Sequence, residues 1–351
     1  MPERNGRMWR RVGSPEEGFT YLNTRGNAIR SPRALKRIAS LVIPPAYADV
    51  RIAPNPSHYI QAVGVDSRGR TQYIYHPDFR AERDDLKYQT LREFALRLPL
   101  VRRRVNAILA QPDDGLSRDW VLSVVLRLLE HSHFRIGSDR YARQNKTYGL
   151  TTLRKKHLTI EGQILVFQYA GKRGKEQRHV LTDPQMAEYL QRIRKVPGWW
   201  LFEYYDESGT KRRVSRQMVN DFIKETMGSE FSSKYFRTWG GTLIAARKLA
   251  ELGPAPDEKT ADANIITAVD QVAEQLGNTR AIARKSYIAP EVLQLYREEG
   301  KTLERYYNHS TERIVRHARE DYDPDEVALL KLLGLTPRKI ERELERMDGG
   351  G

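Results

Sequence analysis

The spacing of hydrophobic and polar positions divides the chain into a strand-rich beginning and a mainly helical remainder. In the first ninety residues, β-prone residues alternate with polar ones, as in 59–64 and 71–75, which flank the turn-like 66–69. This alternation predicts an antiparallel hairpin. A short helix is expected from Pro32, closed by the Ile43-Pro-Pro break.

From about residue 84 the apolar positions recur every three or four residues, which is typical of an amphipathic helix. The predicted stripe consists of Leu91, Phe94, Ala95, Leu98, Val101, Val105 and Ile108. Pro99 should kink or divide this helix. A second helix is expected over 120–134, with Ser117 as its N-cap. We therefore place a domain boundary near residue 88, between a β-rich domain 1–88 and a helical domain 89–351.

One further hairpin interrupts the helical part. Strands are predicted on both sides of the basic, glycine-hinged tip Gly171-Lys-Arg-Gly-Lys. Beyond it we expect helices at 184–194, 215–227, 232–250, 262–276 and 280–287, another from Pro290, and one or two more before a glycine tail. The predicted fold class is α+β: a small antiparallel-sheet domain, then a larger, mainly α-helical domain with a small hairpin sheet.

Charge narrows the choice of partner. The 351 residues include 60 Lys and Arg against 45 Asp and Glu, a formal net charge of +15. Such an excess favours a polyanion, most simply nucleic acid. There is no cysteine, which excludes disulfides, Cys-based metal sites and a Cys nucleophile. Without a signal peptide or an apolar run of membrane-spanning length, we expect a cytoplasmic, nucleoid-associated protein.

Familiar catalytic machinery is missing from the sequence. Gly171-Lys-Arg-Gly-Lys has the wrong spacing for a phosphate-binding P-loop. His131 and His133 are two apart, so in a helix they point to different faces and suit no zinc site. No acidic cluster suggests a two-metal nuclease. We therefore expect neither a metal nor a cofactor.

Cationic and phenolic residues instead follow one another in well-marked contexts. Arg135 follows an apolar helix, Lys172 occupies the hairpin tip, and Arg237 lies in Lys234-Tyr-Phe-Arg-Thr-Trp-Gly. Asn278 and Tyr287 lie near the two ends of the segment Gly277-Asn-Thr-Arg-Ala-Ile-Ala-Arg-Lys-Ser-Tyr. Any one of them singly is most simply a solvated or packing side chain, so the inference depends on their order.

In that order the residues resemble the type IB DNA topoisomerases, closest to the compact poxvirus and bacterial branch. Ile43-Pro-Pro-Ala-Tyr-Ala-Asp-Val and Gly69-Arg-Thr-Gln-Tyr-Ile-Tyr-His-Pro extend the resemblance into the first domain. It runs from roughly residue 19 to 300, and no motif covers the last fifty residues. The resemblance implies an isomerase that relaxes positive and negative supercoils through a transient 3′-phosphotyrosyl link, without ATP or metal.

The resemblance also assigns roles. Tyr287 would be the nucleophile, Arg135 and Arg237 would hold the non-bridging phosphate oxygens, Lys172 would protonate the leaving 5′-oxygen, and Asn278 would donate a hydrogen bond. Asn278 stands where the viral enzymes have His, and Ser138 where they have Lys. The residues expected to contact DNA are Gln72, Tyr73, Tyr75, Tyr141, Lys234 and Arg173. Lys155, Lys156, Lys175, Arg212 and Arg213 are further candidates for backbone contacts. The two domains suggest a monomer that clamps duplex DNA.

Two alternatives stay open at this point. A tyrosine recombinase shares the Arg–Lys–Arg–Tyr set, but it should have His at the position of Lys234 and usually His or Trp at that of Asn278. No histidine occurs between His179 and His309. A non-catalytic, basic DNA-binding protein would suit the charge equally, but it has no need of Tyr287 or of a buried Arg237.

Overall fold

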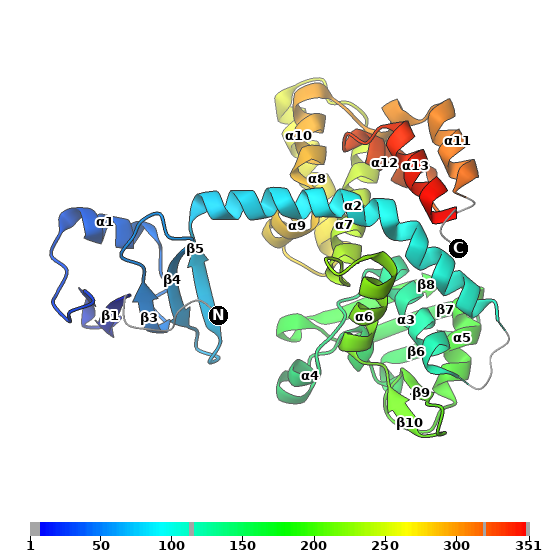
Figure 1. Cartoon of the computed structure of the whole chain (residues 1–351), viewed down its shortest axis with the longest axis horizontal. Helices are drawn as coiled ribbons and strands as arrows, with labels where there is room; N and C mark the ends of the chain where they lie inside the picture. The colour runs from blue at the N-terminus through cyan, green and yellow to red at the C-terminus, as the bar shows by residue number, and fades with distance from the viewer. Residues whose placement is uncertain (1–7, 112–115, 319–320, 349–351) are drawn as a thin grey trace. The chain divides into compact units, whose positions relative to one another are not determined.

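The structure is a computed structural model that describes residues 8–111, 116–318 and 321–348, without the side chains of 80–85 and 173. The chain divides into two compact units, Met1–Tyr88 and Gln89–Gly351, each with its own core. The α+β class predicted from the sequence is confirmed (Figure 1). Within the described residues, no helix combines the length and the apolar character needed to cross a bilayer.

The described part of the first unit contains a five-stranded antiparallel sheet with a short helix packed on it. Its strands follow the order β2-β1-β3-β4-β5. They are β1 (Trp9–Ser14), β2 (Gly18–Leu22), β3 (Ala48–Ile52), β4 (Ile60–Val65) and β5 (Thr71–Tyr75), and the helix is α1 (Pro32–Ser40). Ile38 of α1 packs on Val50, Ile52 and Ala62 of the sheet.

The predicted hairpin is present as β4 and β5, with Val63 opposite Tyr73 and Val65 opposite Thr71. Its turn depends on Asp66, whose Oδ1 accepts hydrogen bonds of 3.0 Å from the amides of Arg68 and Arg70. Asp66 thereby stabilises the turn that an Asp-Ser-Arg-Gly sequence favours.

The second unit is mainly helical. Its main helices are α2 (Pro77–Leu109, beginning in the first unit), α3 (Arg118–Ser132), α4 (Asp139–Asn145), α5 (Pro184–Arg194), α6 (Arg216–Met227), α7 (Lys234–Leu252), α8 (Glu258–Gln275), α9 (Arg280–Tyr287), α10 (Pro290–Glu299), α11 (His309–His317), α12 (Pro324–Leu332) and α13 (Pro337–Asp348). The described residues of this unit also form the 3-10 helices Leu150–Thr152, Lys155–His157, Lys172–Gly174 and Leu303–Tyr306. The strands are β6 (Leu158–Glu161), β7 (Ile164–Ala170), β8 (Glu176–Thr182), β9 (Glu203–Tyr205) and β10 (Lys211–Arg213).

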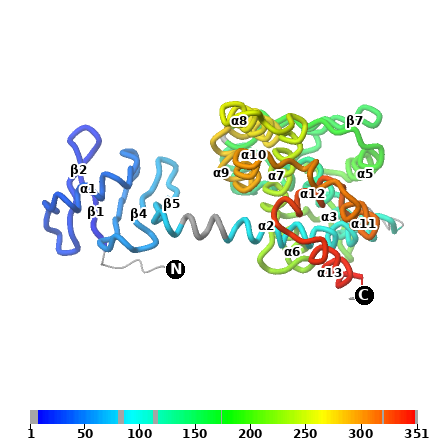
Figure 2. Tube along the Cα trace, turned by 90° about the horizontal axis from the view of Figure 1, so that it is seen from above, coloured from blue at the N-terminus to red at the C-terminus, as the bar shows by residue number. Residues whose placement is uncertain are grey.

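Two small antiparallel sheets accompany these helices. The sheet β6-β7-β8 contains the predicted hairpin, whose tip is the 3-10 helix Lys172–Gly174, and β9 pairs with β10. Ser117 caps α3 as predicted, because its Oγ accepts from the amide of Trp120 at 3.4 Å. In Figures 1 and 2, α7, α8, α9 and α10 lie side by side.

The predicted apolar stripe of α2 lies in the core of the second unit. Leu91, Phe94, Ala95 and Leu98 are almost fully buried. The ring of Phe94 meets Phe236 of α7 edge-on, with 5.0 Å between their centroids.

Of the two outcomes predicted at Pro99, a kink or a division, the division does not occur, because α2 continues through Pro99. A proline in a helix leaves the carbonyl four residues earlier without its N–H partner. Here that carbonyl belongs to Ala95, and it accepts a hydrogen bond of 2.7 Å from the buried hydroxyl of Tyr322. A side chain distant in sequence replaces the missing backbone donor.

In the described part of the last fifty residues there are three α-helices, α11 to α13, where one or two were predicted. The glycine tail expected after them lies outside the described residues. These helices are tied to the rest of the unit by Glu326, which is 2% exposed. Its carboxylate accepts hydrogen bonds from Arg102 of α2 and from the indole of Trp239 of α7, the latter at 3.0 Å. Burial would raise the Glu326 pKa, but Arg102 and Trp239 hold it below its usual value.

Candidate active site

Four of the five predicted catalytic residues lie in one chain of contacts. The Arg135 guanidinium donates to Asn278 Oδ1 at 2.5 Å and to the Gly277 carbonyl at 3.2 Å. The Leu276 carbonyl accepts from both Asn278 Nδ2, at 3.3 Å, and Arg237, at 2.9 Å. The Arg237 guanidinium carbon then lies 4.9 Å from the centre of the Tyr287 ring.

Arg237 is held deep inside the unit. It is 5% exposed, and it also donates to the carbonyl of His133. Its Nε is buried and finds no acceptor among the described residues. Burial lowers the pKa of Arg237, while Tyr287 opposes the shift. A buried guanidinium with an unused donor is an arrangement suited to an incoming anion.

Lys172 lies apart from this chain of contacts. It is exposed at the β7–β8 tip, and no interaction of its ammonium group is seen within the part of the chain that the structure describes. The strand that follows the tip does reach the site, because Gln177, the second residue of β8, accepts from Arg135 at 3.4 Å. A side chain at Gly171 would place a Cβ 2.5 Å from Gln177 Cγ, and one at Gly277 would place it 2.2 Å from Gln177 Oε1. The two glycines therefore allow Gln177 to fit between the hairpin and the loop that carries Asn278.

Sequence reasoning missed Gln177, and it also missed the double glycine of α7. A Cβ on Gly240 would lie 2.2 Å from Cε1 of His133, and a Cβ on Gly241 would lie 2.6 Å from the Tyr287 carbonyl. Where another segment of the protein approaches a backbone this closely, only glycine leaves enough room. The Trp-Gly-Gly sequence indicated a close contact at this point of the helix, but it could not predict that His133 and Tyr287 make the contact.

A group of buried and half-buried rings lies near the guanidiniums. His179 is 4.3 Å from Phe134 between ring centres, and its Nε2 is 3.4 Å from the Tyr169 hydroxyl. Burial, reinforced by Arg237, lowers the pKa of His133 and of His179 to about 4. Burial raises the pKa of Tyr169. All three groups are thus neutral at pH 7, and the positive charge of the site belongs to the arginines.

The predicted DNA contacts are distributed over both units. Tyr73 and Tyr75 stack on one face of β5 with 6.0 Å between ring centroids, and Gln72 donates to Asp66 at 2.9 Å. Tyr141 is 44% exposed on α4, and Lys234 is exposed at the start of α7. The side chain of Arg173 lies outside the described residues.

Of the further backbone-contact candidates, three already have partners within the protein. Arg212 pairs with Asp206 and Arg213 with Asp139, while Lys155 donates to the Val196 carbonyl. Lys156 and Lys175 are exposed.

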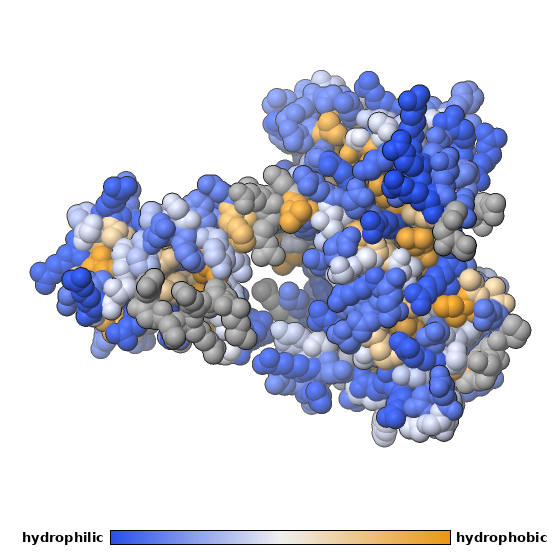
Figure 3. Space-filling view, in the orientation of Figure 1, coloured by the Kyte–Doolittle hydropathy of each residue, from blue (hydrophilic) through white to orange (hydrophobic). Residues whose placement is uncertain are grey.

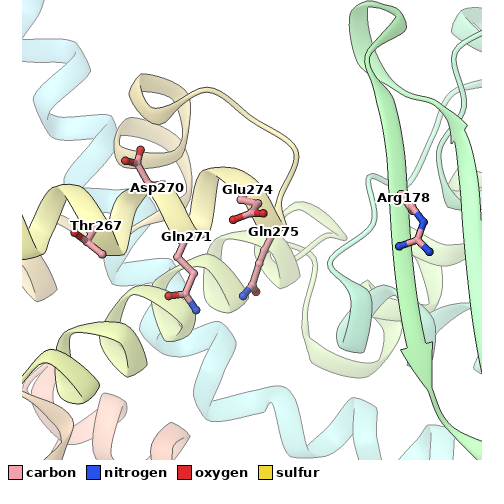
Figure 4. Close-up of a pocket in the computed structure, with 6 residues that line it drawn as sticks. All are labelled: Arg178, Thr267, Asp270, Gln271, Glu274 and Gln275. Atoms are coloured by element: carbon pink, nitrogen blue, oxygen red, sulfur yellow. The ribbon is translucent and has the colours of Figure 1, made fainter.

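A pocket of about 640 Å³ adjoins the site between α8 and β8 (Figure 4). Its α8 side carries Asp270 and Glu274, and Arg178 faces them from β8. Asp270 already binds Arg280 through two hydrogen bonds. The carboxylates make this pocket unsuitable for a phosphate group.

A mainly helical unit that brings two guanidiniums, an amide and a phenol together has groups chemically suited to a phosphate ester. Comparison with known proteins identifies the family. The family model described as eukaryotic DNA topoisomerase I, catalytic core, matches residues 76–314, and that described as bacterial DNA topoisomerase IB, N-terminal domain, matches 18–66.

Individual relatives agree. DNA topoisomerase 1B of Acanthamoeba polyphaga mimivirus is 33% identical over 285 residues, which cover 79% of this chain and 84% of that protein. DNA topoisomerase 1B of vaccinia virus (strain Copenhagen) is 25% identical over 251 residues, 68% of this chain and 73% of the relative. The chain belongs to the type IB DNA topoisomerase family, whose members are isomerases. The family predicted from the sequence is confirmed, and the recombinase interpretation is not supported.

Proposed function

We propose that the chain relaxes supercoiled duplex DNA by breaking and rejoining one strand through Tyr287. The observation that carries the proposal is the position of Tyr287 against Arg237, whose buried Nε has no acceptor among the described residues. A phenol of pKa about 10 is a weak nucleophile, so a site that uses it must stabilise the charge developing on phosphate. Arg237 and Arg135 supply two such cations.

In the proposed cleavage step, the Tyr287 oxygen bonds to the scissile phosphorus as the bond to the 5′-oxygen breaks. The phenolic proton leaves to solvent, and Lys172 protonates the departing 5′-oxygen. Arg135, Arg237 and Asn278 hold the non-bridging oxygens of the transition state. One phosphate ester replaces another, so the reverse reaction reseals the strand without ATP. Lys172 must approach the phosphate for this step, and an exposed hairpin tip leaves it free to do so.

Between cleavage and rejoining, the free 5′ end rotates and releases superhelical tension of either sign. We propose that Gln72, Tyr73 and Tyr75 of the first unit contact the duplex, and Tyr141, Lys234 and Arg173 of the second. The 1–88 and 89–351 division would then separate a DNA-clamping domain from a catalytic domain in a monomer. The setting proposed for this reaction is the nucleoid in the cytoplasm.

The test is plasmid relaxation with EDTA present and ATP absent, for the wild type and for Tyr287→Phe. We expect the wild type to relax both positive and negative supercoils, and the variant to bind DNA without relaxing it or becoming covalently attached. A wild type that binds duplex DNA but leaves both plasmids supercoiled would refute the proposal and favour a non-catalytic binding protein.

A further inference from the structure

A second pocket, of about 460 Å³, is rich in basic and aromatic side chains. We call it the Arg154 pocket. It is formed by α4, the segment between Tyr148 and Lys156, and Trp200. The side chains used in the argument are those of Arg143, Lys146, Tyr148, Arg154, Lys156 and Trp200.

Arg154 is the half-buried cation of this pocket, and two aromatic rings of the lining contact it. Its guanidinium carbon lies 5.6 Å from the ring centre of Tyr148 and 5.4 Å from that of Trp200. Its amide donates to His157 Nδ1 at 3.0 Å. The Nε atom is buried and has no acceptor among the described residues. The protein thus holds a cation between two rings and leaves a hydrogen-bond donor of that cation unused.

The other three cations surround it at the surface. Arg143, Lys146 and Lys156 are exposed, and the structure gives none of them an ion pair in the ranges it describes. No described residue lining the pocket is a carboxylate. Arg213 stacks on Trp200 from outside the lining, with its guanidinium carbon 3.5 Å from the ring centre, but Asp139 already balances its charge. Four positive charges therefore converge without a negative partner in the lining.

The pocket is also joined to the catalytic residues through the backbone. The amide of Tyr148 donates to the carbonyl of Ala170, at the end of β7, at 2.8 Å. Two residues further along, the amide of Leu150 donates to the carbonyl of Arg135, also at 2.8 Å. Tyr141, a proposed DNA contact, precedes Arg143 on the same helix. A duplex seated at Arg135 therefore passes near these cations.

We propose that the Arg154 pocket binds a non-scissile phosphate of the DNA backbone. This inference rests on the proposed function, because it assumes that DNA is bound at Arg135. Exposed lysines act as point charges suited to backbone phosphates, and Arg154 adds a fixed donor that defines the position. The pocket would contribute to affinity and to the register of the duplex, and would take no part in bond breaking.

The first test measures duplex binding over a series of salt concentrations in a Tyr287→Phe background. Each phosphate contact adds about 0.9 to the slope of log affinity against log salt. We expect Lys156→Gln and Arg143→Gln to weaken binding and to reduce that slope, by about one unit when combined. Arg342→Gln is the matched control, since it removes one exposed charge on α13 and should leave the slope unchanged. Equal slopes in all variants would overturn the proposal.

The second test locates the phosphate by replacing one backbone phosphate at a time with an uncharged methylphosphonate. We expect one position away from the cleavage site to weaken binding by the wild type but not by the Lys156→Gln, Arg143→Gln variant. Titration with inorganic phosphate and with ATP tests whether the pocket binds a free anion instead of a DNA phosphate. If either anion binds the wild type but not the variant, and no duplex position shows coupling, the pocket is a free-anion site and the proposal fails. Since all these readouts measure binding, loss of relaxation by the wild type would refute only the proposed function.

Discussion

Arg237 combines two properties that oppose each other in a folded protein. It is 5% exposed, and burial lowers its pKa, yet the carbonyls of His133 and Leu276 and the face of the Tyr287 ring surround it instead of a carboxylate. A buried cation without an anionic partner is costly. The cost is understandable if the missing anion is the phosphate of the substrate, since binding then supplies the partner.

Arg237→Lys tests whether the planar guanidinium matters beyond its charge. Lysine keeps the charge but cannot reach two carbonyls and a phosphate oxygen from one plane. We expect the single-turnover cleavage rate to fall roughly 10²- to 10³-fold, the effect typical of losing one transition-state donor. Quenched-flow kinetics on a short duplex at saturating enzyme would measure it. A variant that cleaves at the wild-type rate would show that charge alone suffices.

The order of residues along the sequence predicts which side chains come together at the site. It does not predict the neighbouring residues that hold them in place. Arg135, Arg237, Asn278 and Tyr287 were expected to act together, and the structure joins them in one chain of contacts. His133 and Gln177 were not expected, because each acts through tertiary contact. His133 offers a carbonyl from a residue at φ 51, just after α3 ends. No local sequence pattern predicts the contact that either residue makes with the site.

At the scale of elements, the β7–β8 hairpin is joined to the site through Gln177, which we interpret as a positioning residue. We expect Gln177→Ala to slow cleavage about fivefold, since the loss of one hydrogen bond is worth about 1 kcal/mol, with little change in DNA affinity. Gln168→Ala is the matched control, because Gln168 is an exposed glutamine of β7 whose side chain donates to Glu176 and has no contact with Arg135 in the part of the chain that the structure describes. Rapid-quench rates and binding isotherms separate the two effects. Equal losses in both variants would indicate a general weakening of the hairpin.

The elements themselves were largely predictable where one period runs undisturbed. The stripe of α2 and the strands on either side of Gly171-Lys-Arg-Gly-Lys are present as expected, because burial of one face fixes each of them. The fate of Pro99 was not predictable, since it depends on Tyr322, more than 220 residues later. The short pair β9 and β10 and the helix α4 also have too few residues to show a period.

Tyr322 provides a test of how α2 passes through Pro99. Tyr322→Phe removes the donor from the Ala95 carbonyl while keeping the ring, so it leaves a buried acceptor unpaired. We expect a loss of about 1–3 kcal/mol in the free energy of unfolding. In a Pro99→Ala background the helix regains its own N–H donor, and the same substitution should cost less. Urea denaturation of the four proteins completes the cycle. Equal costs in both backgrounds would refute the link.

For the whole molecule, the buried histidines predict a loss of stability in weak acid. Burial lowers the pKa of His133, His157 and His179 to about 4, whereas an unfolded histidine has a pKa of about 6.5. Between these values the unfolded chain binds more protons than the folded one. The histidine contribution is therefore complete above pH 6.5 and declines as the pH falls toward 4. Protonation of folded His133 would place a second charge beside Arg237, so relaxation by the folded protein should decline as the pH approaches 4.

Comparing variants separates the histidine contribution to acid sensitivity from that of the carboxylates, which also titrate in acid. His133→Asn removes the titrating ring, and Asn tolerates the left-handed backbone at φ 51. We expect its free energy of unfolding to fall less between pH 7 and pH 5 than that of the wild type, in urea titrations at both values. His131→Asn changes an exposed ring in the last turn of α3 and should follow the wild type. If His133→Asn loses as much stability as the wild type, the acid sensitivity does not come from His133. If the free energy of unfolding falls less than in the wild type in both variants, removing any histidine has this effect, and the burial of His133 is not the cause.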